Sequence, residues 1–325
     1  KIKIMANLDI AEKRLPQDGR IHYKTAEEQF DIRVSVLPTL HGEKVVLRLL
    51  NNSATNIELT KVGFSDFDLE NYLQGVKRPN GILLISGPTG SGKTTTLYAT
   101  LKHLNKETRN ILTIEDPIEY TLEGINQVQL KESIGPSVAS ALRTFLRQDP
   151  DVIMVGEIRD PETANMAIRA ALTGHLVLST IHTNSAWGTV SRLMDMGIPG
   201  FLVANTLNTT VAQRLIRLLC PHCKTESPVE SSIYPKQFKP FYEVHTHFSA
   251  TGCQECFYTG YKGRKAVYEV IPVDQELSVE IKQGNLYIEP LLKERGIRTL
   301  AENAFALFAA GETSIDEIYP LLFSY

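Results

Sequence analysis

The N-terminal part of the chain alternates apolar and polar positions, which is typical of short strands with one buried face. Phe30–Val36 shows this alternation and Lys44–Leu50 repeats it, so we predict two strands joined by a turn over Pro38–Gly42. Residues 1–50 are therefore expected to form a small α/β or mostly β module. The residues that follow are polar, and we predict an interdomain linker at 51–60.

Beyond the linker, continuous apolar runs alternate with amphipathic stretches, the pattern of strands that alternate with helices. Such alternation predicts an α/β domain with a parallel sheet and right-handed crossovers. The predicted strands are 82–86, 110–116, 152–157 and 176–182.

Two helices between these strands have predictable faces and ends. One is expected over Pro136–Gln148, and the next begins after the N-cap Asp160, has Pro161 as its first residue and stops at Gly174. Their apolar faces carry Val138, Ala141, Leu142 and Phe145 in the first helix and Ala164, Ala167, Ile168 and Ala171 in the second. We expect these faces to pack in the core and not to hold a cofactor.

Composition narrows the class of protein. The chain has 325 residues, 42% of them hydrophobic, and a formal net charge of -3, so it lacks the overall basic field of a protein whose main partner is nucleic acid. No apolar run approaches the roughly 18 residues that a membrane span needs. No signal peptide is visible, and because the sequence starts at Lys1 without an initiator Met we expect it to be part of a longer protein.

The most specific motif is Gly87–Thr94, which matches G-x-x-x-x-G-K-[ST] in full. It lies between the predicted strand 82–86 and a predicted helix over Thr94–Asn105, so its N–H groups and the helix N-terminus point at one anion. Lys93 is expected to neutralise the β- and γ-phosphates of a nucleoside triphosphate, and the Thr94 hydroxyl to ligate Mg²⁺. The predicted nucleotide contacts are Gly87, Pro88, Thr89, Gly90, Ser91, Gly92, Lys93, Thr94 and Thr95.

Acidic residues follow two of the other predicted strands. Glu119 comes after 110–116, and Glu157 ends the strand that runs through 152–157. Hydrolysis of a nucleoside triphosphate needs carboxylates at the carboxyl ends of neighbouring strands, for Mg²⁺ and for the attacking water. The alternative interpretation of each is a solvated charge at a strand end.

Two histidines bracket the fourth predicted strand. His182 follows its carboxyl end, beside the expected phosphate position, where its ring can hydrogen-bond the γ-phosphate. His175 lies at the opposite end of that strand, where geometry gives it a weaker role.

All four cysteines of the chain form two C-x₂-C pairs. Cys220 and Cys223 make the first pair and, 29 residues later, Cys253 and Cys256 make the second. Paired knuckles of this kind favour a structural Zn²⁺ held by four thiolates, with the intervening residues forming a small lobe. Disulfides are the alternative, but a phosphate-loop protein is expected in a reducing cytosol.

Taken together, these segments resemble the secretion ATPases of bacterial type II secretion and type IV pilus assembly, the GspE/PilB family. The resemblance covers nearly the whole chain. It rests, in order along the chain, on the phosphate loop Gly87–Thr94, the acidic box Thr113–Glu119, Arg147–Asp151 leading to Glu157–Asp160, the histidine box Gly174–Asn184 and the tetracysteine lobe.

The resemblance implies a domain organisation. Residues 1–50 would be the C-terminal part of a PAS-like α+β N-terminal domain. Residues 61–325 would be a RecA-like P-loop ATPase domain, including a zinc-binding lobe at 218–262 and a C-terminal helical part at 265–325.

The resemblance also implies roles for single residues. Glu119 matches the family's proposed catalytic base and Glu157 the acid on the Mg²⁺ side, although the sequence leaves these two roles exchangeable. His182 matches a γ-phosphate sensor. Arg20 and Arg33 fall where the family places arginines that reach the phosphates across a cleft between domains. The predicted catalytic residues are therefore Glu119, Glu157, Lys93, His182, Arg20 and Arg33.

The implied function is that of a hexameric motor ATPase that assembles a pilus or a type II secretion pseudopilus. The implied location is the cytoplasm, peripheral to the inner membrane, with inner-membrane platform and docking proteins as partners and no direct contact with nucleic acid. ATP, Mg²⁺ and Zn²⁺ are the expected cofactors. Two alternatives remain open: a nucleotide-gated scaffold without significant hydrolysis, and a nucleic-acid translocase, which the acidic balance disfavours.

Overall fold

The computed structural model describes residues 1–24, 29–51, 57–130 and 137–323. Residues 52–56 of the predicted linker and Pro136, the first residue of a predicted helix, lie outside this part of the chain. The described residues divide into two compact units, Lys1–Ile57 and Glu58–Tyr325. None of the helices in the described ranges is long and apolar enough to cross a membrane.

The first unit is a three-stranded antiparallel sheet with strand order β1-β2-β3 and one short helix. Its elements are α1 (Ile2–Met5), β1 (Gln17–Lys24), β2 (Gln29–Thr39) and β3 (Gly42–Asn51). The two predicted strands are confirmed as β2 and β3, but the predicted turn over Pro38–Gly42 is too long. Thr39 pairs with Gly42, which leaves a two-residue turn. Pro38 fits within β2 because β1 pairs with β2 only as far as Val36, so one side of β2 is open there.

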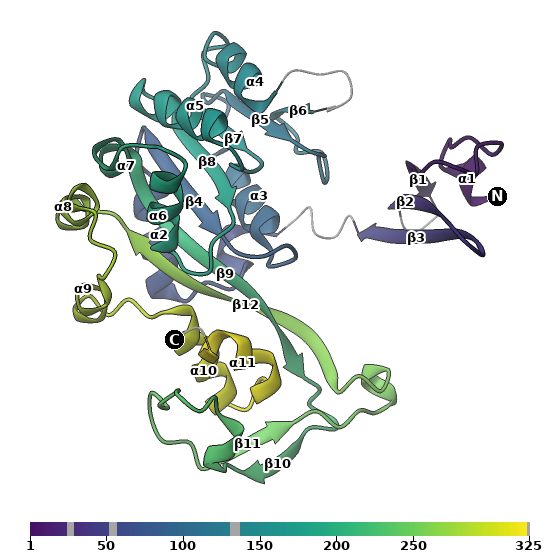
Figure 1. Cartoon of the computed structure of the whole chain (residues 1–325), viewed down its shortest axis with the longest axis vertical. Coiled ribbons are helices and arrows are strands. Elements are labelled where there is room, and N and C mark those ends of the chain that lie inside the picture. Colours follow the sequence, from purple (N-terminus) through teal and green to yellow (C-terminus); the bar gives the residue numbers. More distant parts are fainter. Residues whose placement is uncertain (25–28, 52–56, 131–136, 324–325) are drawn as a thin grey trace. The chain divides into compact units, whose positions relative to one another are not determined.

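The second unit is built on a seven-stranded sheet with the order β12-β9-β4-β8-β7-β5-β6 (Figure 1). The four predicted strands are confirmed as β4, β5, β7 and β8, which run parallel to their neighbours. The strands of this sheet are β4 (Gly81–Ser86), β5 (Ile111–Glu115), β6 (Asn126–Gln129), β7 (Val152–Val155), β8 (Leu176–Ile181), β9 (Leu207–Leu219) and β12 (Tyr261–Pro272).

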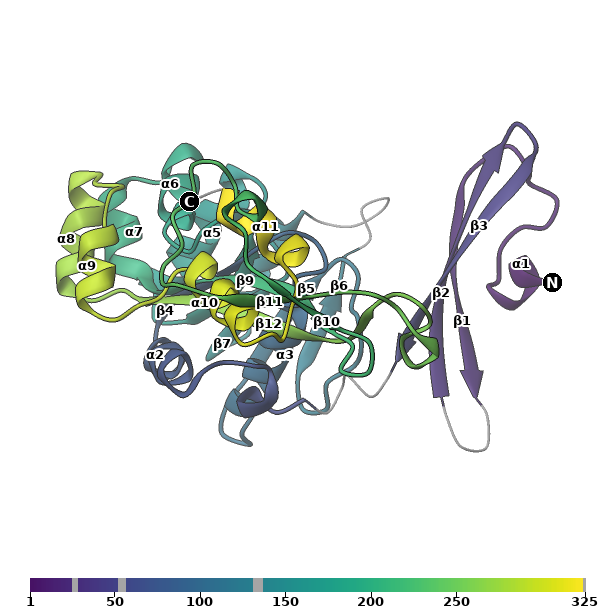
Figure 2. The same ribbon diagram turned by 90° about the horizontal axis from the view of Figure 1, so that it is seen from below.

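Helices cover both faces of this sheet (Figure 2). Along β4, Ile82 and Leu84 pack into one core and Leu83 and Ile85 into the other, which is why the strand reads as a continuous apolar run. α2 (Asp66–Val76) and α3 (Lys93–Leu104) contribute to the second core. The first core is lined by α4 (Val138–Phe145), α5 (Pro161–Leu172), α6 (Gly188–Asp195) and α7 (Gly200–Thr206).

Contacts within one turn explain where two of the predicted helices begin. Ser137 caps α4 by accepting the N–H of Ser140, and Asp160 caps α5 by accepting the N–H of Thr163. Pro161 is the first residue of α5, as predicted. The predicted inward faces are buried, except that Val138 is only partly so.

The sheet is not purely parallel, which corrects the prediction. β12 pairs antiparallel with β9, and together they extend beyond the sheet as a long hairpin (Figure 1). β9 contains no simple apolar run because the buried residues Thr209, Thr210 and Gln213 interrupt it. We expected residues 265–325 to be helical, but the first of them, up to Pro272, belong to β12. Helices follow as α8 (Gln275–Gln283), α9 (Glu289–Glu294), α10 (Leu300–Ala309) and α11 (Ile315–Phe323).

A small lobe lies at the far end of this hairpin (Figure 1). It contains the antiparallel pair β10 (Thr225–Pro228) and β11 (Thr246–Ser249). The segment between these strands packs on α10, because the rings of Tyr234 and Phe238 lie 6.1 and 5.8 Å from the ring of Phe305. The lobe is therefore joined to the C-terminal helices by an aromatic cluster.

Candidate nucleotide site and cysteine cluster

The phosphate loop turns directly from β4 into α3. Gly92 caps α3 in the left-handed conformation, at φ +89°, which a side chain would disfavour. At Gly87, a Cβ would lie 2.5 Å from the carbonyl oxygen of Gln213 and 2.6 Å from Ser91 Oγ. The loop therefore fits against β9 only with glycine at this position, and the first N–H groups of α3 remain directed at its concave side.

Lys93 folds back onto its own loop. Its Nζ donates to the carbonyl oxygens of Gly87 at 2.7 Å and Pro88 at 3.0 Å. Burial lowers the pKa of Lys93, although the nearby Glu157 acts in the opposite direction. Thr94, the predicted Mg²⁺ ligand, is exposed beside it. The lysine thus donates to two carbonyl oxygens of its own loop.

Glu157 and His182 are brought together with the loop. His182 Nε2 lies 2.7 Å from Glu157 Oε1, and His182 Nδ1 lies 3.0 Å from the carbonyl oxygen of Gly87. Glu157 follows β7, His182 follows β8 and Gly87 follows β4, and these strands are adjacent in the order β4-β8-β7. The carboxyl ends of three neighbouring parallel strands therefore build one polar site.

Two arginines border this pair that the sequence analysis did not single out. Arg159 Nε donates to Glu157 Oε2 at 2.8 Å. Arg192, on α6, lines the same open pocket of about 250 Å³ together with Glu157 and His182. Arg159 contacts a residue only two positions away, whereas Arg192 reaches the pocket from a separate helix, so its convergence depends on tertiary packing that leaves no signal in the sequence.

His175 is separate from this site. It lies at the start of β8, and its Nδ1 is 2.9 Å from the carbonyl oxygen of Ala170 on α5. The structure thus gives the two histidines of the predicted box different surroundings.

Glu119 is held by a different set of contacts from Glu157. It lies in the loop after β5, half-buried, and its backbone N–H donates to the hydroxyl of Tyr98 on α3 at 3.3 Å. Tyr98 also donates to Oε2 of Glu115, the last residue of β5. The acidic box therefore contacts the helix that follows the phosphate loop.

A network behind the loop fixes the residues that follow His182. Arg214, on β9, donates to the carbonyl oxygen of Asn184 at 3.2 Å. Glu269, on β12, is buried and accepts the N–H groups of Ala186 at 2.8 Å and Leu300 at 3.1 Å. Burial raises the pKa of Glu269, and the two N–H donors act against that shift. β9 and β12, which the sequence analysis missed, thus support the predicted site.

In the first unit, Arg20 and Arg33 are direct cross-strand partners. Arg33 also pairs with Arg48 on β3, so one row across the sheet carries three arginines. Like charges directly opposite each other are unfavourable in a sheet unless an anion or another acidic group compensates them. Arg48 was not among the predicted residues, because its alignment with Arg20 depends on strand register.

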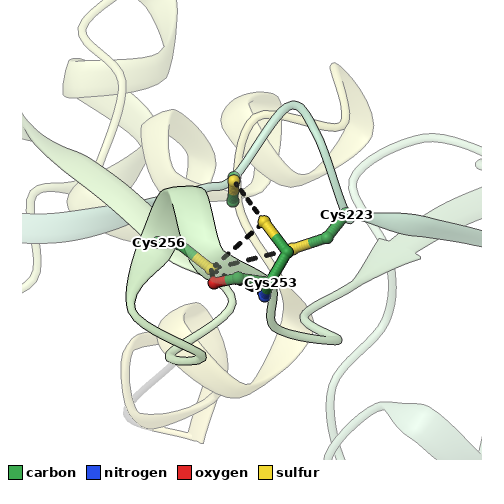
Figure 3. A group of neighbouring side chains, drawn as sticks. Cys223, Cys253 and Cys256 are labelled. Atoms are coloured by element: carbon green, nitrogen blue, oxygen red, sulfur yellow. Dashed lines mark hydrogen bonds between the residues drawn. The ribbon is translucent and has the colours of Figure 1, made fainter.

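The four cysteines form one cluster (Figure 3). The Sγ atoms of Cys220 and Cys253 lie 3.9 Å apart, and those of Cys223 and Cys256 lie 3.8 Å apart. All four ligand atoms lie within 4.8 Å of one another, and none forms a disulfide. Four sulfurs bound tetrahedrally to Zn²⁺ at about 2.3 Å are separated by about 3.8 Å, so the donor set fits this ion.

Backbone donors support the cluster. The N–H groups of Cys253 and Gly260 each lie 3.2 Å from Cys256 Sγ. Desolvation acts to raise the pKa of Cys256, but these donors and the neighbouring thiols outweigh it and lower the pKa to about 6. His247, buried near Phe308, and His245, exposed at the surface, are not part of the cluster.

Comparison with known proteins gives the chain its family. The family model described as "Type II/IV secretion system protein" matches residues 1–320. The chain belongs to this family. Among its secretion-system relatives, the type IV pilus assembly ATPase PilB of Myxococcus xanthus is 48% identical over 98% of this chain and 57% of its own length. The type II secretion system ATPase E of Vibrio cholerae is 46% identical over 98% of this chain and 63% of its own length.

The chain thus spans about 57 to 63% of the length of these relatives. Solved structures agree on the fold. The pilus retraction motor PilT, solved with bound ADP, superimposes with a TM-score of 0.69 at 27% identity, covering 94% of this chain and 77% of that one. The ATPase DotB of Legionella pneumophila gives a TM-score of 0.70 at 21% identity, covering 96% of this chain and 78% of that one.

Proposed function

We propose that this chain is the motor part of a Mg²⁺-dependent ATPase that powers assembly of a pilus or a type II secretion pseudopilus. The observation that carries the proposal is the contact series from Gly87 through His182 to Glu157, which joins the phosphate loop after β4 to an acidic side chain that follows β7. Relatives named as a type II secretion ATPase and a type IV pilus assembly ATPase support it.

In this proposal, ATP binds at Gly87–Thr95 and displaces Lys93 from the carbonyl oxygens of Gly87 and Pro88. Lys93 then holds the β- and γ-phosphates. Thr94 and Glu157 would hold Mg²⁺, which supplies charge neutralisation of the phosphates when it is bound. Glu119 orients and deprotonates the attacking water, and His182, within reach of both Gly87 and Glu157, reports the γ-phosphate.

The zinc proposal rests on the cysteine cluster. Sulfur separations of 3.8 and 3.9 Å match a tetrahedral thiolate site, and four protein ligands leave no position for substrate. Zn²⁺ would therefore act structurally, by fixing the end of the β9–β12 hairpin to the lobe.

We also propose the assembly that the family resemblance implies. The first unit would be the end of a PAS-like domain and the second a RecA-like domain, in a cytoplasmic homo-hexamer at the inner membrane with platform and docking proteins as partners. In the first unit, Arg20 and Arg33 lie in one cross-strand row with Arg48, and the family resemblance implies that arginines here reach phosphates.

Whether bound ATP is hydrolysed to ADP distinguishes the proposed ATPase from a nucleotide-gated scaffold. Protein in excess over radiolabelled ATP should convert it to ADP with Mg²⁺ and fail to do so with EDTA. Release of unchanged ATP under both conditions would overturn the ATPase and favour the scaffold.

A further inference from the structure

The helix that follows the phosphate loop carries a buried tyrosine with two polar contacts. Tyr98, on α3, is 1% exposed. Its hydroxyl donates to Glu115 Oε2 and accepts the backbone N–H of Glu119 at 3.3 Å. One hydroxyl therefore connects α3 to the end of β5 and to the loop that carries Glu119.

Glu115 provides a fixed point for this contact. It is 5% exposed, and its Oε1 accepts Thr113 Oγ1 at 2.7 Å and Gln127 Nε2 at 3.0 Å. A buried carboxylate is tolerated only when its oxygens have such donors. Since the proposed chemistry gives Glu115 no other task, its contacts indicate an anchor for the tyrosine.

The Tyr98 hydroxyl must stay protonated to donate to Glu115, and its surroundings favour that state. Burial, followed by the charge of Glu115, raises the pKa of Tyr98 well above its usual range, so the hydroxyl stays protonated and can donate. The ring of Tyr120 packs edge-on against that of Tyr98, with 4.5 Å between centroids. Both the position and the orientation of the Tyr98 hydroxyl are therefore constrained.

We propose that Tyr98 is a positioning residue that holds the backbone at Glu119 in register with the phosphate loop. α3 begins at Lys93, so a rigid helix connects the residue that holds the phosphates to the residue that fixes Glu119. The inference rests on the proposed function, in which Glu119 activates the attacking water. Misplacement of such a group by about 1 Å costs up to roughly 100-fold in rate.

Tyr98→Phe tests this inference against the matched variant Tyr72→Phe. Tyr72, on α2, is also buried, and its hydroxyl lies 2.7 Å from Thr100 Oγ1 on α3. Each variant removes one buried tyrosine hydroxyl: that of Tyr98 joins α3 to the acidic loop, and that of Tyr72 joins α2 to α3. We expect Tyr98→Phe to lower kcat about 10-fold with KM for ATP unchanged, and Tyr72→Phe to leave kcat within about twofold of the original chain.

A double variant shows whether Tyr98 acts through Glu119. Glu119→Gln should itself lower kcat, and adding Tyr98→Phe should lower it by less than about twofold more, because the group being positioned is already disabled. Amide hydrogen exchange gives a readout without turnover: residues 116–120 should exchange faster in Tyr98→Phe and at the original rate in Tyr72→Phe.

Three results would overturn the inference: equal kcat in the two tyrosine variants, a full 10-fold further loss in the double variant, or unchanged exchange at 116–120. A different result would contradict the role that the proposed function gives Glu119. If Glu119→Gln turns over ATP at the original rate, Glu119 is not the base, while the exchange rates still report whether Tyr98 holds that segment.

Discussion

His182 Nε2 lies 2.7 Å from Glu157 Oε1, and the other ring nitrogen of His182 lies 3.0 Å from the carbonyl oxygen of Gly87. The histidine therefore touches the phosphate loop and the acidic strand end at once. Any ligand that moved either neighbour would change these two contacts of His182. This relationship is the basis for the predictions on nucleotide chemistry.

Replacing Glu157 should separate binding from hydrolysis. Glu157→Gln keeps the shape of the side chain but removes its charge, so we expect ATP affinity to change by less than about 10-fold and kcat to fall on the order of 100-fold. Steady-state turnover and equilibrium nucleotide binding measure the two effects. Glu162→Gln is the matched control, since Glu162 is an exposed acid on α5 paired with Arg143. Equal turnover in both variants would remove Glu157 from the mechanism.

Removing the lysine of the phosphate loop should weaken nucleotide binding itself. Lys93→Ala deletes the cation next to the expected phosphates, and we expect ATP affinity to fall about 100-fold. Binding of a fluorescent ATP analogue measures this. Lys102→Ala, on the same helix, serves as a control for loss of a positive charge. Affinity that falls no further in Lys93→Ala than in the control would refute the assignment of the loop.

Metal analysis of purified protein should find one zinc per chain. Cys220→Ser and Cys253→Ser each remove one ligand, and we expect both to lose the metal and to lower Tm by about 5 °C or more. His245→Ala should keep the full metal content, because its side chain lies outside the cluster. A chain that folds with reduced cysteines and no zinc would contradict the assignment.

Stability should depend on pH through Glu317. Burial alone would raise the pKa of Glu317, but the Arg217 side chain, 2.9 Å from Glu317 Oε1, and the Arg217 backbone N–H lower it below 4.5. A depressed pKa stabilises the folded state above pH 4.5, and that stabilisation is lost as the pH falls through the folded-state pKa.

Glu317→Gln should therefore lower Tm by about 2 to 4 °C at pH 7, and the difference from the original chain should shrink below pH 4.5. Both proteins are melted at each pH, so acid loss of metal affects them equally. A difference that stays constant from pH 7 to pH 3.5 would show that charge has no part in the contact.

The elements that could be predicted are those with local causes. β4, β5, β7 and β8 are mostly apolar because both of their faces are buried, and Asp160 and Pro161 start α5 through contacts within one turn. The cysteine cluster was predictable because spacing alone brings each pair together.

The remaining features depend on tertiary contacts. Buried polar residues such as Gln213 obscure β9 in the sequence, and they are tolerated because partners elsewhere in the fold satisfy them: Gln213 Oε1 accepts Thr96 Oγ1 at 3.0 Å. The alignment of Arg48 with Arg33 depends on strand register, and the contact of Tyr98 with Glu115 depends on the packing of α3 beside β5. Neither leaves a periodic pattern in the chain.

The most direct test of the motor proposal is ATP hydrolysis measured against protein concentration, with Glu157→Gln as the impaired reference. A ring whose subunits share sites predicts that activity per chain rises as assembly proceeds and stays on the order of 100-fold lower in the variant at every concentration. Activity per chain that stays constant across the range, or turnover in Glu157→Gln equal to that of the original chain, would contradict the proposal.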